Sequence, residues 1–579
     1  MRFEPISAED IIAELTQPLE KRDEAKEPVR PVYTLRHRSV VGKLDLKHRV
    51  IEIAVDIQEC EFLDEVDLRY CEFKQVVDFS KCHFKKHFDS GNRGEAHTIY
   101  RKDLICRGAE FAGPFDLHGG LIEGSAFFAG AKFLSEKRSV DFGWTSVGET
   151  LVFDRTLFKG AADYSNVKCA GTGRFENSSF EGEVDFHGAS FGRSLFCGGA
   201  IFKAKASFNT LDCEDSAFFD SAMFEGEVDF TRASFGGDLY YREAIFKAKA
   251  IFNTPKCGNS AFFNLATFEG EANFVNASFS RSLFCREAIF KKKASFNTLD
   301  CEDSAFFDPA TFEGEVDFRR ASFGGGLYCR GANFERYVTL YQSKIGMLSL
   351  GRTLPFGENS RVDLRECQFD RFDGSSKVAK EMAAKQRPEE FSRDPYLQLE
   401  KYYRGVGNEL EAKRLHYMGR RDLRENAKDK NGRTEWPLLT RWGDWCLKWL
   451  TGYGVHTWLL LIPIFFFLGV GTWVFWPSEA LVTTPGTHGQ SNEGQEANAL
   501  YLASTGSSQE QSQGGLGQHL FHRVSYSLDL FLPVVNLHID EDWQPNGLGR
   551  QIYAVVHSMV GWILVPLLLA SLAGIIRRE

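Results

Sequence analysis

Large apolar residues recur every five or six positions through the middle of this 579-residue chain. From Phe180 onward the steps are 6, 5, 5 and 6, so that four steps close a unit of 22 residues. Two units form a longer repeat of 44 residues, and the phrase KAKASFNTLDCEDSAFFD at Lys203 returns almost unchanged at Lys291. The residues that mark the period are Phe180, Phe186, Phe191, Phe196, Phe202, Phe208, Phe218 and Phe224, with Cys213 in the remaining slot.

This period excludes an ordinary helix or strand, because side chains in those structures repeat every 3.6 and 2 residues. It suits a short extended piece followed by a corner, with one large side chain pointing inward from each of four faces. A small residue often stands two positions before the Phe, as in Ala189-Ser190-Phe191. Residues i and i−2 of an extended segment share a face. The pattern predicts a square β-tube whose core is a ladder of the eight Phe residues.

The repeated A-x-F phrase resembles a variant of the A-(D/N)-L-x-x pattern of the pentapeptide-repeat family, from about Cys60 to about Phe369. That resemblance implies a right-handed quadrilateral β-helix. With 22 residues per coil and roughly 4.8 Å between stacked strands, the repeats give about 14 coils. The six-residue steps depart from the family pattern, and we expect them to appear as bulged corners that leave the stack unbroken.

Composition divides the chain into five regions, which together predict a mainly β protein with helices toward its C-terminus. They are an N-terminal tail or helix (1–31), a β cap (32–59), the solenoid (60–374), a helical juxtamembrane linker (375–450) and a membrane region (451–579). The cap is predicted because Val32 to Ile57 alternates apolar and polar residues, as half-buried strands do.

Within the linker, residues 395–426 are predicted to be helical, with a turn at Gly405 and Gly407. The apolar residues expected to line one face of these helices are Leu397, Tyr402, Val406, Leu410 and Leu415. We expect the helices to cap the solenoid or to pack near a membrane.

None of the 13 cysteines forms a CxxC pair, and those of the solenoid follow the repeat. Cys213, Cys257 and Cys301 lie 44 residues apart, and no cluster combines Cys with His at zinc-ligand spacing. They therefore read as small apolar core residues that stay reduced in the cytosol. We expect no metal site.

Two uncharged segments predict membrane spans, Trp458 to Trp476 (19 residues) and Ile552 to Ile576 (25 residues). Ten Lys and Arg lie between Lys413 and Lys448, whereas the loop 477–551 carries two. The positive-inside rule then places both termini in the cytoplasm. No signal peptide is visible at the N-terminus, and the family favours the inner membrane of a bacterium. The alternative is a buried helical hairpin of a soluble domain.

The loop contains a segment, 519–545, that reads as an amphipathic or partly re-entrant helix stopped near Pro533. Its place between two spans is similar to that of the pore helix in two-helix ion channels, but a TVGYG-type filter is absent. Its phrase YSLDLFLP is similar to a YSLD-x-x-LP motif of membrane-associated pentapeptide-repeat proteins. The candidate pore or re-entrant residues are Asp529, Pro533 and Asn536.

Nothing in the chain predicts an enzyme, since no phosphate loop, G-x-S-x-G or HExxH motif occurs, and no cofactor is expected. The net charge of −10 argues against nucleic-acid binding. The charge also alternates, with nine acids and four bases in 202–244 but three acids and five bases in 246–288, which disfavours DNA mimicry. The main hypothesis is a membrane-anchored, non-catalytic scaffold whose solenoid binds a protein partner, and a homo-oligomer is compatible with it. The alternative is an oligomeric ion-channel-like or membrane-perturbing effector gated by the solenoid.

Overall fold

The computed structural model of the chain describes residues 3–17, 32–92, 94, 97–386, 391–426, 438–453, 456–477, 479–483, 516–532 and 543–573. The chain divides into two compact units, Met1–Ala412 and Lys413–Glu579. The first contains the repeats and the second the apolar helices, and each unit is described by itself.

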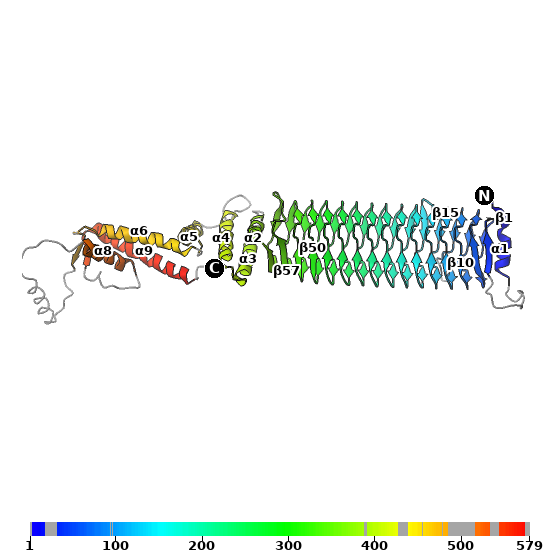
Figure 1. The fold of residues 1–579 in the computed structure, drawn as a ribbon, viewed down its shortest axis with the longest axis horizontal. Coiled ribbons are helices and arrows are strands. Elements are labelled where there is room, and N and C mark those ends of the chain that lie inside the picture. The colour runs from blue at the N-terminus through cyan, green and yellow to red at the C-terminus, as the bar shows by residue number, and fades with distance from the viewer. Residues whose placement is uncertain are drawn as a thin grey trace, which may run out of the picture. The chain divides into compact units, whose positions relative to one another are not determined.

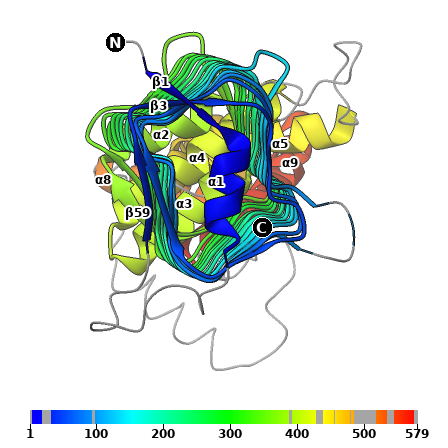
Figure 2. The same ribbon diagram turned by 90° about the vertical axis from the view of Figure 1, so that its right-hand side faces the viewer.

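The repeats form a β-solenoid, which confirms the predicted fold (Figure 1). Most strands are two residues long, and one coil is built from β29 (Ser190–Phe191), β30 (Leu195–Phe196), β31 (Ile201–Phe202) and β32 (Ala206–Ser207). The next strand, β33 (Asp212–Cys213), pairs in parallel with β29. The strands stack into two sheets of 15 strands and one sheet of 29 that covers two faces, and the view along the solenoid axis shows the four-sided outline (Figure 2).

The core of the solenoid is an aromatic stack on each of several faces. Six of the eight Phe residues predicted for it are buried: Phe180, Phe186, Phe191, Phe202, Phe208 and Phe224. Phe196 and Phe218 do not belong to this core, and placing them there was wrong. Successive side chains of a strand point to opposite sides, and Leu195 and Cys197 are the inward residues on either side of Phe196.

The corners alternate between two kinds. Counted between inward residues, Phe180 to Phe186 and Phe191 to Cys197 are six-residue steps, and the two intervening steps have five. Left-handed residues lie in the five-residue corners, for example Gly188 with φ +64° and Gly199 with φ +65°. The six-residue corners leave the strand pairing in register, so the bulges expected there are not needed.

The 44-residue repeat arises because large and small side chains alternate on adjacent faces of successive coils. Phe191 shares its coil with Cys197, whereas in the next coil Cys213 is followed by Phe219, and all four are buried. Close-packed interiors tolerate little change in volume, so this exchange keeps the filling of each coil nearly constant. Phe235 and Tyr241, both large, depart from the alternation.

The N-terminal residues close the first coil rather than forming a tail. Strand β1 (Glu4–Ser7) pairs in parallel with β3 (Arg38–Val41), and helix α1 (Ala8–Leu15) buries Ile11 and Leu15. Residues 32–59, predicted as a separate β cap, already form strands of the three sheets. For example, β2 (Val32–Arg36) pairs with β6 (Ala54–Gln58).

Helices close the other end of the solenoid. The last coil includes β57 (Lys344–Gly351), β58 (Arg361–Asp363) and β59 (Gln368–Gly374), and α2 (Ser376–Ala384) and α3 (Asp394–Gly405) follow it. The Val362 N–H donates to the Lys385 carbonyl at 3.1 Å, and the Glu366 N–H donates to Asp394 at 3.2 Å. These bonds occupy backbone groups that an open sheet edge would expose.

The turn between α3 and α4 (Glu409–Asn426) confirms the predicted break, with Gly407 at φ +78°. The predicted apolar face was largely wrong. Leu397, Val406 and Leu410 are exposed. The buried residues of this region are Tyr396, Leu399, Tyr403, Ala412 and Leu415.

The second unit is helical. It contains α5 (Leu438–Thr451), a 3-10 turn η3 (Thr457–Leu460), α6 (Leu461–Val474), α8 (Leu516–Phe531) and α9 (Leu548–Leu572). Helix α8 packs against both α6 and α9. Strands β60 (Leu481–Thr483) and β61 (Trp543–Pro545) pair antiparallel at the two ends of the chain segment that includes α8.

Candidate functional site on the outer faces of the solenoid

A column of aromatic rings runs along the outside of the solenoid, on the face formed by the second strand of each coil, counted from β29. We call it the aromatic ladder, and it comprises Phe196, Phe218, Tyr240, Phe262, Phe284, Phe306 and Tyr328. Its strands are β30, β34 (Ala217–Phe218), β38 (Leu239–Tyr240), β42 (Ala261–Phe262), β46 (Leu283–Phe284), β50 (Ser304–Phe306) and β54 (Gly326–Tyr328).

Each ring of the aromatic ladder stacks on the rings above and below it. Centroid distances run from 4.6 Å (Phe196–Phe218) to 4.9 Å (Phe262–Phe284), and the planes lie within 18° of parallel. All seven residues are half-buried. Stacking covers the ring faces and leaves their edges toward solvent, so the ladder presents a continuous narrow apolar stripe seven coils long.

Arginines flank the stripe at every second coil. The guanidinium carbon of Arg242 lies 5.2 Å from the centroid of Tyr240, that of Arg286 lies 5.2 Å from Phe306, and that of Arg330 lies 5.5 Å from Tyr328. Such cation–π contacts stabilise an exposed site by about 0.5–1 kcal/mol each. They also hold positive charge beside an apolar surface.

These arginines belong to a charged column that runs beside the ladder. Arg242 pairs with Asp220 at 2.7 Å, and Arg330 pairs with Asp308 at 3.5 Å. Arg286 has Asn264 in the corresponding position and donates its backbone N–H to that side chain at 3.0 Å. Toward the N-terminus the column becomes acidic at Glu176, which pairs with Arg174.

Sequence reasoning missed the aromatic ladder, although a signal for it is present. Doublets such as Phe218-Phe219 and Phe262-Phe263 repeat every 44 residues. Because neighbours in a strand point to opposite sides, one ring of each doublet must lie outside. In Phe196-Cys197 and Phe284-Cys285 the cysteine takes the inward place, and this hides the same arrangement.

A row of aspartates follows another face. The register stacks Asp45, Asp67, Asp89, Asp116, Asp141, Asp163 and Asp185 on consecutive coils. Each carboxylate next to a corner accepts the N–H two residues later, as Asp163 does from Ser165 at 2.9 Å, which is the usual role of Asp in a turn. Lys43, Lys47 and Arg69 surround Asp67, and despite burial the pKa of that carboxyl lies well below its usual range.

Within the described residues, one group in this row has the composition of a metal site: His87, Asp89 and Asp116, whose ligand atoms lie within 4.8 Å of one another. Strand stacking brings these residues together, so no linear spacing could have indicated them. Asp89 already accepts the Gly91 N–H and pairs with Arg69 at 3.1 Å. Asp116 accepts the His118 N–H at 2.9 Å. The same turn contacts occur along the whole row and account for the cluster.

Twelve of the thirteen cysteines are buried free thiols, and Cys446 is partly exposed. Burial raises the pKa of Cys169 and of Cys257 to about 11. A protonated, buried thiol is a poor nucleophile and a poor metal ligand. Cys60 differs, because a hydrogen bond with Cys82 lowers its pKa to about 7, but its side chain is also buried. All twelve therefore act as core side chains.

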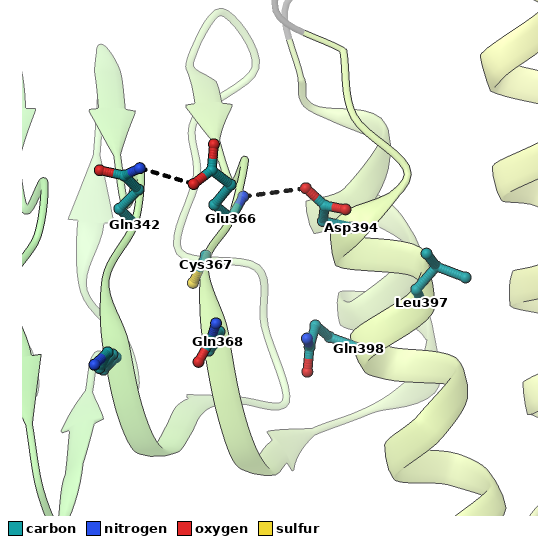
Figure 3. Close-up of a pocket in the computed structure, with 8 residues that line it drawn as sticks. Gln342, Glu366, Cys367, Gln368, Asp394, Leu397 and Gln398 are labelled. Atoms are coloured by element: carbon teal, nitrogen blue, oxygen red, sulfur yellow. Dashed lines mark hydrogen bonds between the residues drawn. The ribbon is translucent and has the colours of Figure 1, made fainter.

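A cavity of about 450 Å³ opens between the last coil and α3 (Figure 3). Gln342 donates to Glu366 at 2.7 Å on one side, and Asp394 and Gln398 of α3 lie on the other. The Glu366 N–H, on the wall of this cavity, already donates to Asp394 of α3. The geometry of the cavity is that of a crevice beside a packed helix.

In the second unit, polar side chains meet between three helices. His557 Nε2 of α9 lies 3.0 Å from the carbonyl oxygen of Ser527 in α8, and the Ser527 hydroxyl donates to the Leu468 carbonyl of α6 at 3.3 Å. Asp529, a candidate pore or re-entrant residue, is buried in α8 with 7 % of its surface exposed. Pro533 and Asn536, the other two candidate residues, lie outside the described residues.

Among the described helices, α9 is long and apolar enough to cross a membrane. The first predicted span forms the shorter apolar helix Trp458–Val474. Many large apolar side chains of both segments point outward, although Leu460, Ile464 and Leu564 are buried between helices. The exposed residues include Phe465, Phe466 and Trp473 of α6 and Val555, Met559, Trp562 and Ile563 of α9.

Comparison with known proteins agrees with the solenoid. The family described as pentapeptide repeats (9 copies) matches residues 300–344, which cover β49 (Asp300–Cys301) to the start of β57. No curated protein and no solved structure matches the chain. The matched repeats continue, with the same period and the same stacked strands, through the coils on their N-terminal side. The chain is a pentapeptide-repeat protein.

Proposed function

We propose that this protein is a membrane-anchored, non-catalytic scaffold whose solenoid binds a protein partner. The anchor is the pair of apolar segments around α6 and α9. The proposed location is the inner membrane of a bacterium, with both termini in the cytoplasm, on the charge asymmetry described above. The docking surface is the outside of the solenoid, which is long, regular and mixed in charge.

The main support for a membrane anchor is the distribution of apolar and polar side chains in the helical unit, which is the reverse of that in a soluble domain. Of the most apolar 18-residue stretch of α9, 22 % is buried inside the unit. In this respect α9 is unlike the core helix of a soluble protein, which is mostly covered. Met559 and Trp562 are 63 % and 66 % exposed, whereas His557 is fully buried. Apolar side chains outside and hydrogen-bonded polar groups between helices are the arrangement that a bilayer favours.

Protein docking is supported by the composition of the aromatic ladder. Aromatic rings and arginines are enriched in protein interfaces and among the residues that contribute most to binding. The partner is proposed to be protein rather than nucleic acid, because acidic and basic residues alternate along the same column and no continuous positive surface results.

Alkaline extraction of membranes tests the anchor. We expect the full chain to stay in the membrane pellet, and the double variant Met559→Asp/Ile563→Asp to be lost from it. Each aspartate on an outward site costs about 2.5–3.5 kcal/mol at the centre of a membrane helix. The matched control is Leu265→Asp/Ile289→Asp, which places the same charges on outward sites of the solenoid and should leave the protein in the pellet. Release of the unmodified chain by alkali, or retention of the 559/563 variant, would refute the anchor.

A channel is the second candidate function, and the buried Asp529 favours it. This carboxyl lies on α8, the helix that packs against both α6 and α9, and ionisable residues within membrane segments commonly mark ion pathways. Purified protein in planar bilayers should then show discrete current steps that Asp529→Asn alters. Silence from folded, inserted protein over a range of voltages would leave the scaffold.

A further inference from the structure

We propose that the aromatic ladder is an interface between two copies of this chain, which pair face to face with their solenoids antiparallel. The occupant of the stripe is thus a second aromatic ladder. This inference deepens the proposed scaffold and rests on it, because it names a second copy of this chain as the protein that binds the aromatic ladder. It does not depend on the membrane anchor.

The spacing of the rings selects the occupant. Successive rings lie 4.6–4.9 Å apart over seven coils. An α-helix laid along the stripe repeats every 5.4 Å and drifts by about 0.6 Å per coil, or about 3–4 Å over six steps. An extended strand repeats about every 6.7 Å on one face. A second ladder has the identical spacing, so its ring edges stay in register with the first along the whole stripe.

The charged column beside the ladder selects the direction. Its C-terminal half carries Arg286, Asp308 and Arg330, a net charge of +1, and its N-terminal half carries Glu176, Asp220 and Arg242, a net charge of −1. The two-fold axis of such a pair lies in the interface, perpendicular to both solenoid axes. The charged columns of the two copies then lie on the same side of the interface and run antiparallel to each other. The basic part of one copy then lies against the acidic part of the other.

The charges also select one register. An axis between Tyr240 and Phe262 places Arg286 opposite Asp220 of the second copy and Arg330 opposite Glu176. An axis through Phe262, half a coil further along, would place Arg286 opposite Arg242 of the second copy. Like charges at an interface oppose association, which disfavours this register. An axis between Phe262 and Phe284 also joins opposite charges, but it leaves Arg286 against Asn264, so the first register is favoured. It also sets Phe306 against Phe196 of the second copy.

Because each chain leaves its solenoid at the C-terminal end, an antiparallel pair has its two exits at opposite ends. The pairing closes on itself and cannot extend into a fibre, as expected for a two-fold interface.

Photo-crosslinking of the full chain, purified in detergent, tests the register. A benzoylphenylalanine at position 306 should yield a covalent dimer whose linked peptide contains Phe196. Those two positions are five coils apart in one chain, about 24 Å, so the link must join two molecules. The same analogue at position 289, on another outer face, should give no dimer. Monomer alone from position 306, a link to position 306 of the second copy, or a link to a different protein in cells would overturn the proposal.

A charge exchange tests the pairing independently of the rings. Arg330→Glu and Glu176→Arg should each raise the dimer dissociation constant about tenfold, as measured by sedimentation of the full chain, and the double variant should restore it. Within one chain these residues lie seven coils apart, about 34 Å, so no intramolecular pair can explain the rescue. Lys247→Glu, which breaks an ion pair with Glu225 on a different face, is the control and should leave the constant unchanged. Loss without rescue, or equal loss in the control, would overturn the proposal.

Discussion

Phe218 and Phe219 are neighbours in the chain, yet their rings belong to different stacks. Phe219 is fully buried and stacks on Tyr241 at 4.8 Å, whereas Phe218 is half-buried on the outside and stacks on Tyr240, also at 4.8 Å. The alternation of side chains in a two-residue strand is sufficient to separate them. At the scale of the residue, the same amino acid therefore holds the tube together at one position and forms its surface at the next.

Substitution of these two neighbours by alanine should separate core from surface. We expect Phe219→Ala to cost about 3–5 kcal/mol of stability, since it leaves a cavity in a packed core. Phe218→Ala should cost about 1 kcal/mol, because it removes stacking contacts at a half-exposed site. Denaturant unfolding of the full chain in detergent measures both. Equal losses would contradict the assignment of the two stacks.

Thiol labelling measures burial in the same core. In the folded chain one thiol, that of Cys446, should react rapidly, and Cys446→Ser should abolish the rapid phase. All 13 cysteines should react after unfolding. Because burial raises the pKa of Cys169 and Cys257 to about 11, they remain protonated at pH 8, and raising the pH from 7 to 9 should not make them reactive. Rapid labelling of several thiols in folded protein would be inconsistent with the stacked core.

The period of the Phe residues was sufficient to predict a solenoid, because neither a helix nor an ordinary strand repeats every five to six residues. The same period could not show that Phe191 points inward and Phe196 outward, because both residues keep the spacing. The direction of each side chain depends on where the strand begins after the corner. The row from Asp45 to Asp185 and the group around His87 come from stacking of residues more than twenty positions apart. The apolar face of 395–426 was missed because helix packing, rather than local pattern, decides which side is covered.

At the scale of the element, two glycines allow α8 to lie against its neighbours. A Cβ atom on Gly471 of α6 would stand 2.2 Å from the Ser527 hydroxyl, and one on Gly561 of α9 would stand 1.9 Å from the Phe531 carbonyl oxygen. Small residues permit such close approach between helices in membranes. The buried contacts of Ser527 with His557 and Leu468 depend on this approach.

Gly471→Ala should therefore displace α8, whereas Gly469→Ala, in the same helix with no atom near the added methyl, should not. We expect the first variant to lower the melting temperature of the detergent-solubilised chain by several degrees and to speed proteolysis near α8. The second should match the unmodified protein, or be slightly more stable, because alanine favours a helix over glycine by about 1 kcal/mol. The same destabilisation in both variants would show that helix geometry rather than packing of α8 is responsible.

At the scale of the whole molecule, a rigid repeat and an apolar helical unit are joined in one chain. The repeat exposes half-buried rings beside paired charges, and both of its ends are closed by capping elements. The helical unit shows the opposite polarity, with apolar side chains outside and polar bonds inside. The proposed function requires that this second unit lies in a bilayer and anchors the solenoid to it.

The most direct test of that requirement is the depth of one side chain in a lipid bilayer. A nitroxide at position 559 of the full chain, in the Cys446→Ser background and reconstituted into liposomes, is compared with a nitroxide at position 265 of the solenoid. We predict that position 559 is accessible to oxygen and protected from a water-soluble nickel complex, and that position 265 shows the reverse. Access of the nickel complex to position 559 as free as to position 265 would contradict the membrane-anchored solenoid.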